Sequence, residues 1–216
     1  GVLCKRCGSA AALGAAAQLA TTKPSALPGS QQKASFADAL AVLATPLLAE
    51  NGGTVKEADG VVTALLALAA KETQEGPRAT ILAAAGRWMP LAAAAASCAT
   101  AFAKGLGEKD AEVRRAHVGG ILAALEACAA ASPPPATLVA AISSLGEPLL
   151  ALIKPALTKP PASGAARADA LGVLCCLREG GQLCPVVEQQ CTKEKLWTLT
   201  LKAKDSFVWH TEPLAA

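Results

Sequence analysis

The residues of this chain with the greatest chemical potential are its eight cysteines. Cys4 and Cys7 have the spacing of a zinc-binding Cys-x-x-Cys pair. A second group lies near the other end, at Cys175, Cys176, Cys184 and Cys191. A zinc site usually takes two closely spaced pairs on loops, whereas Cys175 and Cys176 adjoin on a predicted helix and point in different directions. We expect reduced, dispersed structural thiols, with a small zinc module as the less favoured alternative and a role for the first pair left open.

The two histidines, His117 and His210, raise the question of catalysis. Cys128 shares a helix face with His117, as in a cysteine–histidine dyad. However, His117 belongs to an apolar stripe, where a packed and hydrogen-bonded histidine is commoner than a general base. Cys98 and Cys128 also lie among apolar residues, where a free cysteine behaves as a small hydrophobic residue. Because the common nucleotide-binding and hydrolase motifs are also missing, we predict no enzyme, no cofactor, no metal and no small-molecule substrate.

Composition favours helices. Hydrophobic residues make up 52% of the 216 residues, yet many are alanine, and the chain has 3 Phe, 3 Trp and no Tyr. Alanine has the highest helix propensity and contributes little buried area, whereas sheets favour β-branched and aromatic residues. We therefore predict an all-α fold built from closely approaching helices.

Charge and hydropathy argue against sequence-specific nucleic-acid binding and against membrane insertion. The net charge is +3, and the first 33 residues hold four basic residues and no acidic one, so the remainder is nearly neutral. Sequence-specific nucleic-acid binding calls for clustered cations and stacking aromatics. The longest apolar tract, residues 88–103, is shorter than the roughly 18 to 20 residues that a membrane span needs. We expect neither sequence-specific nucleic-acid binding nor membrane insertion.

Glycine and proline clusters divide the chain. We expect linkers at 21–34 and 159–164, separating the end of one helical repeat at 1–20, a central repeat region at 35–158, and a further, truncated repeat at 165–216. Within the central region, Ser35 is expected to begin a helix that kinks at Pro46. Thr54 and Glu57 have the spacing of a capping box at the start of the next helix.

The most informative helix is predicted from Asp110, a good N-cap residue. Apolar residues and one histidine recur there at four-residue steps and form one face: Val113, His117, Ile121 and Leu125. The opposite face carries the charged residues Glu112, Arg115 and Glu126. Such an amphipathic helix needs a neighbour to cover its apolar face.

This helix resembles the second helix of a HEAT repeat. The residues that carry the resemblance are Asp110, Val113-Arg114, Ala116, Leu122 and Leu125, in the family's order. The resemblance implies that Arg114 pairs with Asp110 or with a carboxylate of a neighbouring repeat. HEAT repeats are about 40 to 47 residues long. The chain offers three units of roughly that size, the middle one enlarged: 35–75, 77–131 and 136–178. The resemblance to HEAT repeats therefore implies a HEAT/armadillo-like α-solenoid of antiparallel helix pairs.

Five short motifs extend the resemblance. They lie at 40–50, 102–106, 113–117, 196–199 and 202–207. In order and spacing they are similar to the N-terminal HEAT region of the general-control-nonderepressible translational activators. That family senses stalled ribosomes and stimulates the kinase of initiation factor two alpha during amino-acid starvation. The resemblance implies a cytosolic, ribosome-associated scaffold with protein partners; the alternative is a HEAT-type interaction module in an unrelated trafficking or cytoskeletal process.

One turn concentrates basic residues and is the candidate interaction patch. Lys104, Lys109 and Arg115 flank the turn before the Asp110 helix, where they could meet the phosphates of a large partner. The neutral alternative is a solvated loop whose acidic residues cancel the field: Glu108, Asp110 and Glu112.

Overall fold

The computed structural model describes residues 27, 29–51, 54–129, 136–146, 148–149 and 151. Its elements, in chain order, are α2 (Ser30–Asn51), α3 (Lys56–Lys71), α4 (Glu75–Trp88), the 3-10 helix η2 (Met89–Leu91), α5 (Ala95–Leu106), α6 (Ala111–Ala129) and α7 (Ala136–Ser144). These described residues contain helices and no strand, which confirms the all-α prediction for this part of the chain. The predicted segments 1–20, 159–164 and 165–216 lie outside the described residues.

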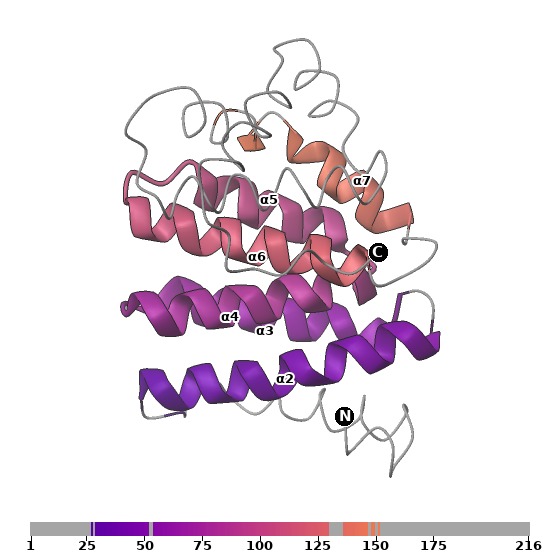
Figure 1. Cartoon of the computed structure of the whole chain (residues 1–216), viewed down its shortest axis with the longest axis horizontal. Helices are drawn as coiled ribbons and strands as arrows, with labels where there is room; N and C mark the ends of the chain where they lie inside the picture. Colours follow the sequence, from indigo (N-terminus) through magenta and orange to yellow (C-terminus); the bar gives the residue numbers. More distant parts are fainter. Residues whose placement is uncertain are drawn as a thin grey trace, which may run out of the picture.

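The helices pack in two alternating sets. α4 lies against α2 on one side and, most extensively, against α6 on the other, whereas α5 contacts α3 and α7. Residues 72–74 join α3 to α4, residues 107–110 join α5 to α6, and both pairs pack together as helical hairpins. Figure 1 shows α2, α4 and α6 as successive layers of one stack.

The connection between α4 and α5 runs through the core. Met89, Pro90 and Leu91 are buried, and η2 contacts every α-helix of the described residues. The backbone N–H of Val55 donates to the Leu91 carbonyl over 2.7 Å. This connection therefore ties the start of α3 to the middle of the helical stack.

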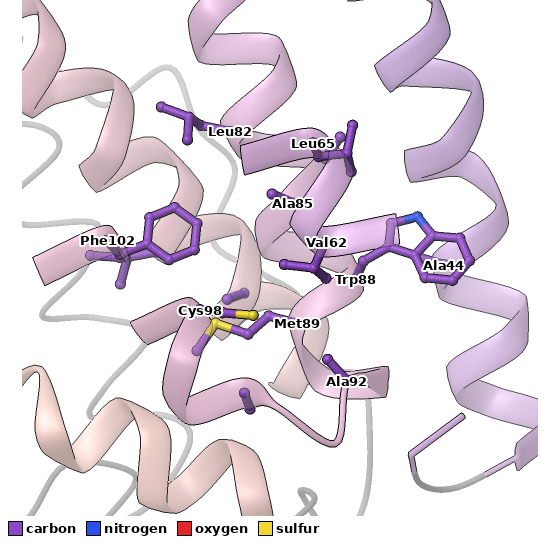
Figure 2. Close-up of a cluster of buried hydrophobic side chains, with 14 of the residues drawn as sticks. Ala44, Val62, Leu65, Leu82, Ala85, Trp88, Met89, Ala92, Cys98 and Phe102 are labelled. Carbon is purple, nitrogen blue, oxygen red and sulfur yellow. The ribbon is translucent and has the colours of Figure 1, made fainter. Parts of the chain in front are cut away.

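Trp88, at the end of α4, links this helix to the adjacent helix α2. Its side chain is fully buried, and the indole Nε1 donates to the Leu40 carbonyl of α2 over 2.8 Å. Figure 2 shows Trp88 beside Ala44 of α2 and Val62 of α3. A single large side chain thus fills space between α4 and α2.

Glycines allow α4 and α6 to approach closely. A methyl group on Gly86 would collide with the Gly120 carbonyl of α6, and one on Gly120 would lie 2.9 Å from the Leu82 carbonyl of α4 and would also collide with the Phe102 ring of α5. The absence of a side chain at both positions therefore sets the separation of the two helices. This is the close packing that the alanine-rich composition predicts.

α2 differs from the prediction at its start. The helix begins at Ser30, not Ser35, so residues 30–34 of the predicted linker are helical. The reason is tertiary, because the Ser30 hydroxyl donates to the buried carboxylate of Glu72, 42 residues away. The helix then continues through Pro46, whose missing N–H removes one backbone hydrogen bond. The kink expected there stays a prediction.

The predicted capping box at the start of α3 does not form. Val55 is the N-cap residue, and no side chain of the described residues caps this helix. Thr54 is exposed, and the chain before the helix is held by the hydrogen bond from Val55 to η2. A tertiary backbone contact has replaced the local one.

Candidate interaction site at the turn between α5 and α6

Asp110 shapes the turn by capping α6. Its Oδ1 accepts hydrogen bonds from the backbone N–H groups of Glu112 (2.8 Å) and Val113 (3.4 Å). These are two of the amides that a helix leaves unpaired at its N-terminus. The predicted N-cap is confirmed, and the Asp110 carboxylate is occupied by the backbone of its own helix.

Arg114 also stabilises the turn between α5 and α6. Its Nη1 donates to the carbonyls of Glu108 and Lys109, each over 2.6 Å, and its side chain is half-buried. The expected ion pair with Asp110 is not formed, and Arg114 has no ion pair with any other described residue. The physical reason is that carbonyls just beyond the end of α5 attract a cation, while Asp110 faces the amides of α6.

Replacing Arg114 by alanine should loosen this turn. Two charge-assisted hydrogen bonds are lost, and we expect a cost of about 1.5–3 kcal/mol in the free energy of unfolding. Chemical denaturation followed by circular dichroism measures it. Lys104→Ala is the matched control, because Lys104 is an exposed cation beside the same turn. Equal stability of the two variants would show that the Arg114 contacts contribute nothing.

The three cations of the candidate patch, Lys104, Lys109 and Arg115, are exposed around this turn. Lys104 lies in the last turn of α5, Lys109 in the connection, and Arg115 near the start of α6. The acidic residues Glu108 and Glu112 are exposed beside them. Asp110 is also exposed and keeps its charge while it caps α6, so the turn carries three exposed cations and three exposed carboxylates.

His117 packs α6 against α5. Its Nδ1 lies 2.8 Å from the Val113 carbonyl, and its ring meets Phe102 edge-on, with centroids 6.2 Å apart and an interplanar angle of 81°. A methyl group on Gly105 would collide with the ring. This is the packed, hydrogen-bonded histidine that its place in an apolar stripe predicts. The Cys128 side chain and His210 lie outside the described residues.

Cys98 is an interior thiol. It is buried in the hydrophobic core, and Figure 2 shows its sulfur beside Met89. Burial, with the nearby Asp59 carboxylate as a smaller cause, raises the pKa of the Cys98 thiol to about 11. The thiol is therefore protonated at neutral pH and is a poor nucleophile. The six other cysteines of the two predicted groups lie outside the described residues.

Glu72 is the charged residue that sequence reasoning missed. Its side chain is 1% exposed, and Oε2 lies 3.4 Å from the Lys33 ammonium. Oε1 accepts hydrogen bonds from the Ser30 hydroxyl (2.8 Å) and from the backbone N–H groups of Thr73 (2.9 Å) and Gln74 (3.0 Å). The carboxylate thus joins the first turn of α2 to the turn between α3 and α4.

These contacts keep Glu72 ionised. The hydrogen bond from the Gln74 amide is the largest cause lowering its pKa to about 2, against the opposing effect of burial, and Ser30 and Lys33 add to the lowering. Arg78 completes the junction, because its Nε donates to the Glu72 carbonyl over 2.9 Å. An acidic residue just before a predicted helix is a sequence signal for capping, but its partners on α2 are invisible in the local sequence.

Within the described residues, no group of three or more His, Cys, Asp or Glu side chains could hold a metal ion. The same part of the chain has no helix long and apolar enough to cross a membrane. Comparison with models of known families, with curated proteins and with solved structures finds no match. The resemblances to HEAT repeats and to the translational activators therefore rest on the short motifs alone.

Proposed function

We propose that this chain is a non-catalytic helical-repeat scaffold, part of a HEAT/armadillo-like α-solenoid that acts in translation control on the ribosome. The observation that supports the helical-repeat part of this proposal is the alternating packing. The α3–α4 and α5–α6 hairpins lie side by side, with α2 and α7 continuing the two sets of helices. Stacked helix pairs that contact mainly their neighbours are the architecture of such arrays.

A scaffold needs surface, and exposed residues follow both sets of helices. On α2, α4 and α6 they include Asp38, Val42, Arg87, Arg115 and Glu126. On α3 and α5 they include Lys56, Thr63, Lys71, Thr100 and Lys104. Contacts spread along such a surface suit a large partner better than a small ligand. The exposed cations around the α5–α6 turn supply a charged contact to ribosomal phosphate, which would weaken with salt.

The five motifs give more support to the proposed repeat fold than to the proposed role in translation control. Residues 40–50 lie in α2, 102–106 end α5, and 113–117 lie in α6. Leu40, Phe102 and Ala116 are buried, so these motifs serve packing and favour the repeat fold. The role in activating the initiation factor two alpha kinase rests on the order of all five motifs, and the motifs at 196–199 and 202–207 lie outside the described residues.

Co-sedimentation tests the proposal in cells. The tagged full chain should travel with ribosomes in sucrose gradients of lysates from amino-acid-starved cells, and the association should be lost when salt is raised, because phosphate contacts are screened. A chain that stays at the top of the gradient at every salt concentration would overturn the ribosomal role. It would leave the alternative, an interaction module in an unrelated trafficking or cytoskeletal process.

A further inference from the structure

We draw no further inference here: the strongest candidate, the buried cluster of Glu72, Ser30 and Lys33 where α2 meets the turn between α3 and α4, is already closed by contacts within this chain, and nothing in the described residues points to a ligand there.

Discussion

Glu72→Ala should lower the free energy of unfolding by about 3 kcal/mol, since hydrogen bonds to a charged group contribute about 1.5–3 kcal/mol each and exposed donors are partly rehydrated. The substitution removes the acceptor that Ser30, Lys33 and the Gln74 amide share. For a chain of this length the melting temperature should fall by roughly 6 to 12 °C. Thermal unfolding followed by circular dichroism measures the change.

Glu108→Ala is the matched control for Glu72. Glu108 occupies the corresponding turn of the neighbouring hairpin, but it is exposed. An exposed substitution of this kind changes stability by no more than about 0.5 kcal/mol. If Glu72→Ala and Glu108→Ala had the same melting temperature, the contacts of Glu72 would not contribute specially to holding α2 against the α3–α4 hairpin.

Acid should remove the contribution of Glu72 in a defined window. The folded-state pKa is lowered to about 2 from the ordinary 4.5, so the unfolded state binds more protons between these values and stability rises with pH there. The contribution is present above about pH 4.5 and is lost as the pH falls toward 2. The stability difference between the parent chain and Glu72→Gln should therefore shrink across this range. A difference independent of pH would mean that ionised Glu72 is not responsible.

Gly120→Ala should destabilise the chain by about 1–3 kcal/mol, the usual cost of overpacking a core. The new methyl group would collide with the buried Phe102 ring and lie 2.9 Å from the Leu82 carbonyl of α4. A backbone carbonyl cannot turn aside as a side chain can, so α4 and α6 must separate. Denaturant unfolding of the variant measures the cost.

Gly119→Ala provides a control of opposite sign. Nothing lies within 4 Å of a methyl group at this neighbouring position of α6. Removing a helical glycine there should stabilise the chain by about 0.5–1 kcal/mol, because less backbone entropy is lost on folding. Stabilisation by both substitutions would contradict the close crossing of α4 and α6.

The sequence was most informative where local chemistry decides the structure. Asp110 caps α6, the charged face of that helix is exposed, and His117 packs as its apolar stripe predicts. These features depend on residues within one or two helical turns of one another. Helix periodicity and capping chemistry are sufficient to predict them.

The features that the sequence did not predict depend on contacts between distant parts of the chain. Arg114 was expected to pair with Asp110 or with a carboxylate of a neighbouring repeat, but within the described residues its guanidinium donates to two backbone carbonyls of the turn. Glu72 meets Ser30, and Trp88 meets the Leu40 carbonyl, across 42 and 48 residues of chain. No local pattern encodes such a distant partner. The interaction patch has a similar limit, because side-chain exposure follows from the fold whereas the identity of a partner does not.

The most direct test of the ribosomal role compares two sets of charge reversals in the full chain, at low salt and with purified ribosomes. One set changes the patch by Lys104→Glu, Lys109→Glu and Arg115→Glu. The matched set makes the same change in net charge at exposed cations of α3 and α4, by Lys56→Glu, Lys71→Glu and Arg87→Glu. Circular dichroism first establishes that both variants keep the helical fold.

We predict that the unmodified chain binds ribosomes, that the patch variant binds about tenfold more weakly because it loses its phosphate contacts, and that the matched variant changes much less. Equal weakening of both variants would show that overall charge, not the α5–α6 turn, governs binding. Failure of the unmodified chain to bind at low salt would contradict the proposed function itself.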